Sequence, residues 1–320
     1  MSNKQKILIS NLVYGEPYTA IFLTLHLKSL LENCHPAPFS RDSIYIIYTD
    51  GKNIETIKSH ENFRQLGEYF EVFFAQIQGD LKYERRYSNQ TIQLQHSMKL
   101  AMERSALMHH AAADLYYGEL FWEKALGSIL NRNVDAIFGH PLRTAYEAVG
   151  SVLTANTFSN DQLFELGFRC LHPIWAFGNW ESPMFSNIPY ALLWTTGDQI
   201  ILRNFSISVL LFRPSEALLK AGGCSDMTIL PNCKSFHVHS EWQEVPLIET
   251  CMLMSFYPPF AHRPASVTNV AAWAKRAIPP SNYKNIRKFF ILKKSSSVPD
   301  WSLIERSGEV SDAIISALET

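Results

Sequence analysis

The hydrophobic and polar positions of the N-terminal half alternate between short apolar blocks and amphipathic stretches. The apolar blocks at residues 6–13, 42–51 and 71–77 predict strands. Between them, apolar residues recur at helical spacing, which predicts a helix at 17–34 and either one helix or two short ones at 53–70. The second block is nearly all apolar, as is typical of a strand that is covered on both faces.

The same alternation continues to residue 143. We predict a long helix at 89–112, a shorter helix at 123–133 and a strand at 134–143. Strands and helices that alternate through short links are typical of a right-handed, mostly parallel sheet. The first half therefore predicts an α/β fold in which helices flank a mostly parallel central sheet.

The pattern changes after residue 150, where helices and strands no longer alternate regularly. The segments predicted there are a helix at 159–179, strands at 199–214 and 233–240, helices within 263–290 and a terminal helix at 310–319. We interpret the two strand segments as parts of a mixed sheet.

The composition excludes some classes of protein. The chain has 320 residues, 47% of them hydrophobic, which is enough to form one large domain or two small ones. Its formal net charge is -1, which does not indicate a nucleic-acid-binding protein. Five cysteines without a C-x-x-C pair predict reduced thiols, with Cys224 and Cys233 as the pair able to bridge a loop.

The N-terminus is polar and then enters a strand, without the apolar region of a signal peptide. The longest apolar stretches fall short of the roughly 20 residues that span a bilayer. We therefore expect a cytoplasmic protein. The basic segment 282–294 is a candidate for peripheral contact with an anionic membrane surface.

The turn after the first strand excludes two nucleotide-binding motifs. It runs from Val13 to Tyr18 and contains one glycine, Gly15. A Rossmann dinucleotide site needs G-x-G-x-x-G there, and a P-loop needs G-x-x-x-x-G-K-[ST], which occurs nowhere in the chain. A methyltransferase is also disfavoured, because its first loop usually holds several glycines. The remaining interpretation is an enzyme that binds a nucleotide with side chains at its strand ends.

Polar residues gather at the ends of the predicted strands. They are Asn11, Tyr14, Glu16, Asp50, Asp114, Tyr117, Glu119, His140 and Arg143. Any one of them also suits a cap or a turn. Ligands of open α/β sheets bind beyond the carboxyl ends of the strands, so the set as a whole predicts a site.

The opening YGEPYTAIFLTLHLKSLL, residues 14–31, resembles bacterial GT-A-like glycosyltransferases, in which a W/Y-G-E-x-Y turn follows the first strand. The resemblance continues through SIYIIYTDG (43–51), ADLYYGELF (113–121) and VDAIFGHPLRTAYE (134–147). It implies a GT-A-like, Rossmann-like fold. It also implies transfer of a sugar from a nucleotide sugar to a glycan or lipid-linked acceptor.

The resemblance implies three consecutive parts: a nucleotide-sugar-binding half at 1–147, an acceptor-binding half at 148–262 and a helical tail at 263–320. We expect nucleotide contacts from Asn11, Tyr14, Glu16, Asp50 and His140. In folds of this type an acid near the position of Asp50 meets the ribose or the base. The Asp50-Gly51 pair is equally typical of a turn.

GT-A enzymes commonly hold a divalent metal with an Asp-x-Asp motif, and this chain has none. The nearest substitute is Asp114 with Glu119, so we expect these to bind Mn²⁺ or Mg²⁺ together with His237 and His239. Alternate residues of a strand point to one face, which places the two histidines side by side. The alternatives are a turn for Asp114, a helix start for Glu119 and a solvent-facing pair of histidines.

Glycosyl transfer needs positive charge at the leaving diphosphate and a base for the acceptor hydroxyl. Arg143 suits phosphate recognition, Glu147 suits the base, and Asp114 is the third catalytic candidate. Arg143 and Glu147 would alternatively form an ion pair four residues apart on a helix.

An aromatic stretch spans residues 172–194. Its large rings are Trp175, Phe177, Trp180, Phe185, Tyr190 and Trp194. Such rings either form a platform for an acceptor sugar or pack as core beneath a loop, and we favour the core.

Two other functions stay open. The missing Asp-x-Asp motif favours a non-catalytic GT-A-like binding or scaffold protein. A metal-dependent hydrolase would use the two histidines with a bound metal.

Overall fold

The computed structural model describes residues 4–33, 39–76, 86–186, 189–223, 225–253 and 264–320. The chain forms two compact units. The first combines residues 1–138 with 208–238, and the second combines 139–207 with 239–320. The assignment of 1–147, 148–262 and 263–320 to donor, acceptor and tail stays a prediction.

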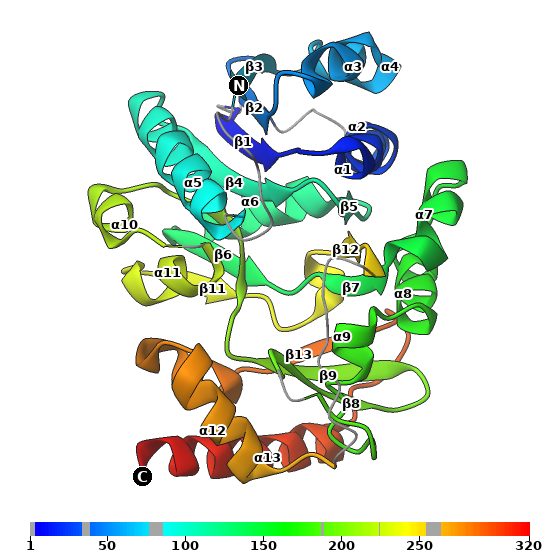
Figure 1. Ribbon diagram of the computed structural model, residues 1–320, viewed down its shortest axis with the longest axis vertical. Helices are drawn as coiled ribbons and strands as arrows, with labels where there is room; N and C mark the ends of the chain where they lie inside the picture. The colour runs from blue at the N-terminus through cyan, green and yellow to red at the C-terminus, as the bar shows by residue number, and fades with distance from the viewer. Residues whose placement is uncertain (1–3, 34–38, 77–85, 187–188, 224, 254–263) are drawn as a thin grey trace. The chain divides into compact units, whose positions relative to one another are not determined.

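The first unit contains a seven-stranded sheet in the order β11-β6-β10-β4-β1-β2-β3 (Figure 1). Its strands are β1 (Ile7–Leu12), β2 (Ile44–Thr49), β3 (Glu71–Gln76), β4 (Leu107–Ala112), β6 (Ala136–Gly139), β10 (Ser208–Phe212) and β11 (Phe236–Val238). Strand β1 pairs in parallel with β2 and β4, and β2 pairs in parallel with β3. Strand β10 is antiparallel to β4. The predicted α/β class with a mostly parallel central sheet is confirmed.

Helices and one short strand complete this unit. They are α1 (Glu16–Ile21), the π-helical segment η1 (Phe22–His26), α2 (Leu27–Asn33), α3 (Asn53–Ser59), α4 (Glu61–Leu66), α5 (Arg86–Glu103), β5 (Leu115–Tyr117), α6 (Phe121–Asn131), α10 (Glu216–Ala221) and α11 (Ser225–Asn232). The segments α1, η1 and α2 follow one another without a break, as the prediction of one helix at 17–34 requires.

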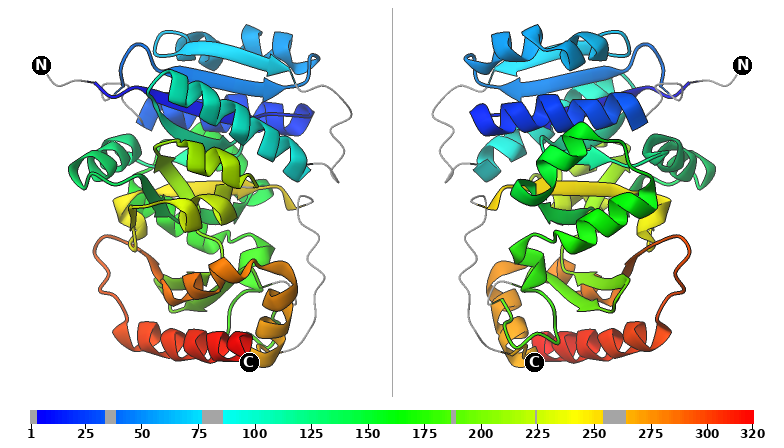
Figure 2. Two further views of the ribbon diagram at one scale, coloured as in Figure 1. Left: turned by 90° about the vertical axis from the view of Figure 1, so that its left-hand side faces the viewer. Right: turned by 90° about the vertical axis from the view of Figure 1, so that its right-hand side faces the viewer.

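Helices cover both faces of β1. On one face, Ser97 Oγ and Gln93 Nε2 of α5 lie 2.8 and 2.9 Å from Ser10 Oγ. On the other face, Asn11 Nδ2 lies 3.1 Å from Nε2 of His26 in η1. Neighbouring residues of a strand point to opposite faces, so α5 and the α1–α2 helix cover opposite sides of the sheet, which Figure 2 shows in its two views. This arrangement explains the nearly continuous apolar strands.

The prediction of one helix at 89–112 is wrong. Helix α5 ends at Glu103, and Ser105 has a positive φ of 51° that breaks the helix. Residues Leu107–Ala112 then form β4, between β1 and β10. Leucine, methionine and alanine are strong helix formers, but pairing with two strands and burial of Leu107 and Met108 override that preference.

Two predicted strands are each divided. The segment 134–143 forms β6 and the separate strand β7 (Leu142–Ala145). The segment 199–214 forms β9 (Gln199–Asn204) and β10, which belong to different units. An apolar run shows that strands are present, but it does not show where one sheet ends and another begins.

The second unit holds two small groups of strands. Strand β7 pairs in parallel with β12 (Leu247–Cys251). Strands β8 (Ala191–Thr195) and β13 (Phe290–Lys293) lie on either side of β9, and both are antiparallel to it.

Its helices are α7 (Tyr146–Ala155), α8 (Asn160–Arg169), α9 (Pro173–Ala176), η3 (Trp242–Glu244), α12 (Val267–Ala277), η5 (Pro280–Arg287) and α13 (Trp301–Glu319). Helix α13 packs against β9 and α12 (Figure 2). It begins before the predicted start at residue 310, because Asp300 Oδ1 accepts a hydrogen bond from Leu303 N at 3.0 Å and caps it.

The aromatic stretch contributes mainly to the core. Trp175, Phe185 and Trp194 are 3%, 5% and 1% exposed, whereas Tyr190 is 37% exposed. The rings with the lowest exposure therefore pack inside the second unit.

The basic segment 282–294 forms η5 and β13, with Ile286 and Phe290 buried and Lys284 exposed. Its contact with a membrane surface stays a prediction. Over the described residues, every helix is too short or too polar to cross a bilayer. Cys170, Cys233 and Cys251 form no disulfide with one another. The proposed bridge partner Cys224 lies outside the described residues.

Candidate functional site

In the sheet of the first unit, the strands that follow β1 in sequence are added first on one side of β1 and then on the other. Strands β2 and β3 lie on one side of β1, and β4 lies on the other. In open α/β sheets ligands bind beyond the carboxyl ends of the strands at such a point. Leu12 at the end of β1 is in register with Ala112 at the end of β4. The turns that carry Tyr14 and Asp114 therefore lie side by side.

We call Tyr14, Glu16, Tyr18 and Asp114 the strand-end site. Gly15 has φ 72°, a conformation that side chains disfavour. Its carbonyl oxygen accepts hydrogen bonds from N and Oγ1 of Thr19, at 3.0 and 2.9 Å. These two bonds fix the turn between β1 and α1.

The fixed turn presents two aromatic rings and a carboxylate. The half-buried rings of Tyr14 and Tyr18 have centroids 5.8 Å apart. Glu16 is exposed in the first turn of α1. Aromatic rings stack with nucleobases, and a carboxylate accepts hydrogen bonds from ribose hydroxyls or base N–H groups. The negative charge of Glu16 repels a diphosphate, so Glu16 suits the nucleoside end of a nucleotide.

Asp114 is 5% exposed and lies in the turn between β4 and β5. Asp50, at the end of β2, forms hydrogen bonds with residues of its own turn. Its Oδ1 accepts hydrogen bonds from Lys52 N at 3.1 Å and Asn53 N at 3.0 Å, and its Oδ2 accepts one from Asn53 Nδ2 at 3.1 Å. The carboxylate of Asp50 thus holds the turn into α3.

Asn11 is fully buried. Its Nδ2 lies 3.1 Å from His26 Nε2, 3.2 Å from Tyr45 Oη and 3.4 Å from the carbonyl oxygen of Ala112. His26 Nδ1 lies 3.1 Å from the carbonyl oxygen of Leu115, and a carbonyl only accepts, so Nδ1 carries the proton. Burial, reinforced by His109, lowers the pKa of His26 to about 3. This network joins β1 to η1, β2 and the end of β4, and so positions the strand-end site.

The predicted site residues His140, Arg143 and Glu147 lie in the second unit. His140 is buried, with Nε2 3.0 Å from the carbonyl oxygen of Ser206 and 3.1 Å from Asn204 Nδ2. Burial lowers the pKa of His140 to about 3. Its ring packs edge-on against Phe290 at 4.9 Å. These contacts are those of a core histidine.

Arg143 of β7 pairs across the strands with Glu249 of β12. Its Nε and Nη2 donate to Glu249 Oε2 at 3.0 and 2.6 Å. Glu147, in the first turn of α7, is exposed, and its two carboxylate oxygens accept hydrogen bonds from Leu253 N at 3.0 and 3.1 Å. Arg143 therefore pairs with Glu249 rather than with Glu147.

His172 is a residue that the sequence did not single out. It is 1% exposed, its backbone N donates to the carbonyl oxygen of Arg143 at 3.0 Å, and its Nδ1 accepts from Ile174 N at 3.2 Å. Burial and then the charge of Arg143 lower the pKa of His172, while the charges of Glu249 and Glu147 oppose that shift. The charges of Arg143, Glu147 and Glu249 all act on His172, so these four residues form one electrostatic cluster around β7 and β12.

The residues expected to bind a metal are spread over the chain. Glu119 is exposed and His237 is half-buried on β11, while His239 Nδ1 lies 3.2 Å from Glu244 Oε2. Within the described part of the first unit, Asp114, Glu119 and His237 do not bring their ligand atoms within 4.8 Å of one another. The binding of a divalent metal by Asp114, Glu119, His237 and His239 stays a prediction.

No protein-family model matches the sequence, and no curated protein matches it. Solved glycosyltransferase structures do match. One is S. aureus TarS, with a TM-score of 0.43 and 12% identity over 98% of this chain and 50% of that chain. A second is residues 1–349 of S. aureus TarS in complex with UDP-GlcNAc, with a TM-score of 0.44 and 11% identity over 98% of this chain and 72% of that chain. A third is mouse xyloside xylosyltransferase 1 in its apo form, with a TM-score of 0.27 and 13% identity over 48% of this chain and 58% of that chain.

The chain spans about half the length of the longer TarS structure. At TM-scores below 0.5, these likenesses decide neither the fold nor the activity of the chain.

Proposed function

We propose that the chain is a glycosyltransferase that binds a nucleotide sugar at its strand-end site and transfers the sugar to a glycan or glycoconjugate. One observation carries the proposal. The turns of Tyr14 and Asp114 follow the adjacent parallel strands β1 and β4, and β2 and β3 extend the sheet on the other side of β1. The same turn carries the YGEPY sequence on which the resemblance to GT-A-like enzymes rests.

The parts of the donor suit different side chains. The base stacks on Tyr14 or Tyr18, and Glu16 accepts hydrogen bonds from the ribose or the base. Asp114, nearest to β4, accepts hydrogen bonds from sugar hydroxyls. The hydrogen bonds of Asn11 with His26 and Tyr45 hold the end of β1 in place.

Glu147 is the proposed general base. Its carboxylate is exposed and is oriented by the N–H of Leu253. In the transfer step the acceptor oxygen bonds to the anomeric carbon, and the bond from that carbon to the phosphate oxygen breaks. The hydroxyl proton passes to a carboxylate base, and the nucleoside diphosphate leaves. Glu249 already compensates the charge of Arg143, so we assign Arg143 a positioning role in β7 and β12.

Calorimetric titration with UDP-GlcNAc, UDP-glucose, GDP-mannose and a CMP-sugar, each with and without Mn²⁺, tests the donor site. We expect one donor to bind, and Glu16→Gln to weaken it about tenfold to a hundredfold, because a charge-assisted hydrogen bond contributes about 1.5–3 kcal/mol. Glu68→Gln is the control, since Glu68 is exposed in the same unit but lies at no strand end that forms the site. Failure of every nucleotide sugar to bind, with and without Mn²⁺, would overturn the proposal.

Turnover tests the base. We expect Glu147→Gln to lower the rate of nucleoside diphosphate release about 10²–10⁴-fold and to leave donor affinity unchanged. Glu305→Gln, an exposed carboxylate of α13, should retain the wild-type rate. A wild-type protein that binds a donor but never releases the diphosphate would instead be the non-catalytic binding protein.

A further inference from the structure

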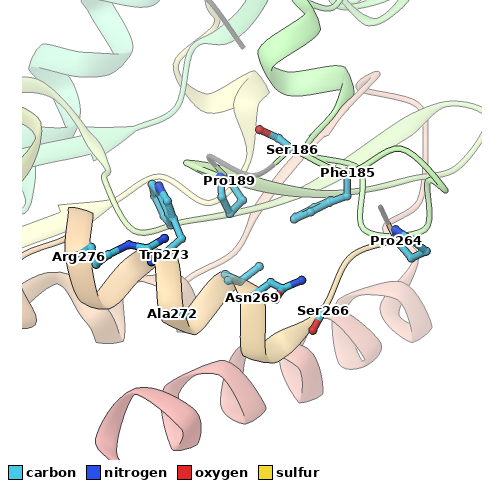
Figure 3. Close-up of a pocket in the computed structure, with 10 residues that line it drawn as sticks. Phe185, Ser186, Pro189, Pro264, Ser266, Asn269, Ala272, Trp273 and Arg276 are labelled. Atoms are coloured by element: carbon cyan, nitrogen blue, oxygen red, sulfur yellow. The ribbon is translucent and has the colours of Figure 1, made fainter. Parts of the chain in front are cut away.

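The second unit contains a pocket of about 270 Å³ beside α12 (Figure 3). Phe185, Ser186 and Pro189 line one side, and residues from Pro264 to Arg276 line the other. No residue of the strand-end site lines this pocket, so it is a separate candidate for ligand binding. Its volume is close to the lower limit of about 300 Å³ that is usual for ligand sites.

The pocket follows one edge of α12. Ser266, Asn269, Trp273 and Arg276 occur at the three- and four-residue intervals that share a helix face. Ser266 and Arg276 are ten positions apart, which corresponds to about 15 Å along the helix axis. The ligand is therefore expected to be elongated. Ala272 leaves room between Asn269 and Arg276, because its side chain is a single methyl group.

Aromatic rings form a fixed apolar wall. Trp273 is 7% exposed, and its ring contacts Tyr190 and Phe205 with centroids 5.1 and 6.0 Å away. Phe185 is 5% exposed and packs at 5.6 Å against Trp180. Because neighbouring rings hold both side chains, they present rigid apolar surfaces, against which the C–H faces of sugar rings pack well.

The opposite edge of the pocket is polar and carries one positive charge. In Figure 3 the guanidinium of Arg276 extends toward Trp273. Arg276 is exposed, and no carboxylate among the described residues lies within 4.0 Å of it. The amide of Asn269 offers donors and an acceptor. Ser266 stands at the N-cap of α12, but its hydroxyl makes no capping hydrogen bond. An uncompensated guanidinium favours a carboxylate or a phosphate.

We propose that this pocket binds an anionic saccharide longer than one ring, with its carboxylate or phosphate at Arg276 and a ring face on Trp273. Its assignment as the acceptor site rests on the proposed glycosyltransferase function. The binding itself does not depend on that function, because the pocket's chemistry belongs to the second unit alone.

Saturation-transfer NMR with four probes tests the binding. The probes are a disaccharide that contains glucuronic acid, the matching neutral disaccharide, glucose 6-phosphate and inorganic phosphate. We expect the disaccharide that contains glucuronic acid to bind at least about tenfold more tightly than the neutral disaccharide and than glucose 6-phosphate, and Arg276→Gln to abolish its advantage over the neutral disaccharide. Lys275→Gln removes an adjacent exposed charge that does not line the pocket, so it should behave as wild type.

Ala272→Leu tests the location, because the larger side chain fills the middle of the pocket at an exposed position. It should abolish saccharide binding, whereas Ala277→Leu, at the exposed end of the same helix, should not. Equal binding of charged and neutral sugars, binding of inorganic phosphate only, or wild-type binding by Ala272→Leu would overturn the inference.

UDP-GlcNAc titrations separate the two proposals. If an anionic sugar binds in an Arg276-dependent way but no nucleotide sugar binds, the pocket stands and the proposed function fails. If a nucleotide sugar binds and no anionic sugar does, the function stands and the inference fails.

Discussion

Arg203 of β9 shows how one buried charge organises the second unit. It is 3% exposed, and its Nε donates to Ser307 Oγ at 2.7 Å. Its Nη1 donates to the carbonyl oxygens of Ile286 and Arg287 at 3.3 and 2.8 Å, and its Nη2 donates to that of Ile304 at 3.0 Å. Burial lowers the pKa of Arg203 to about 10, so the guanidinium stays charged at neutral pH. One side chain thus joins β9 to η5 and α13.

Arg203→Met should destabilise the second unit strongly. It leaves buried carbonyl oxygens of η5 and α13 without a donor, and each such loss costs about 1–3 kcal/mol. We expect the free energy of unfolding to fall by about 3 kcal/mol or more, measured by urea denaturation. Lys275→Gln, at an exposed position, should stay within about 0.5 kcal/mol of wild type. A urea midpoint that does not change in Arg203→Met would contradict this interpretation.

At the scale of elements, β1 and β4 differ in how far local sequence determines them. Ile7–Leu12 is a short apolar block followed by a glycine turn, and both signals are local, so the strand is predicted correctly. Leu107–Ala112 consists of helix-forming residues and histidines, and it is a strand because it pairs with β1 and β10. Pairing between segments about a hundred residues apart leaves no local pattern.

The features of the site also differ in whether local sequence predicts them. The turn at Tyr14 was visible because it interrupts a strand-to-helix pattern. The pairing of Arg143 with Glu249 joins residues 106 positions apart, and the pocket beside α12 combines two distant segments. The contact of Asn11 with His26 depends on the π-helical segment η1, which no residue pattern in the opening helix signalled. Sequence therefore located the strand ends but not the partners of their side chains.

At the scale of the whole molecule, buried neutral histidines couple folding to pH. Burial lowers the pKa of His26 to about 3, and those of His109 and His110 to about 4, all in the first unit. His140 in the second unit is lowered to about 3. Unfolded histidine has a pKa near 6.5, so between these values the unfolded chain binds protons that the folded chain does not.

Stability should therefore be nearly constant above pH 7 and fall as the pH drops below about 6.5, down to about pH 3–4. Each histidine contributes at most about 1.4 kcal/mol per pH unit, and the three of the first unit together contribute up to about 4. Urea midpoints measured at pH 8, 7, 6 and 5 test this dependence. Midpoints that stay level from pH 7 to pH 5 would rule it out.

The order of the chain also limits when each unit is completed during synthesis. Residues 208–238 supply β10 and β11 to a sheet whose other strands end by Gly139. A growing polypeptide that has just passed residue 200 has therefore exposed β4 along the edge that β10 will cover. That edge of β4 stays open to aggregation until residues 208–238 leave the ribosome. A pause or truncation near residue 200 should therefore yield insoluble fragments.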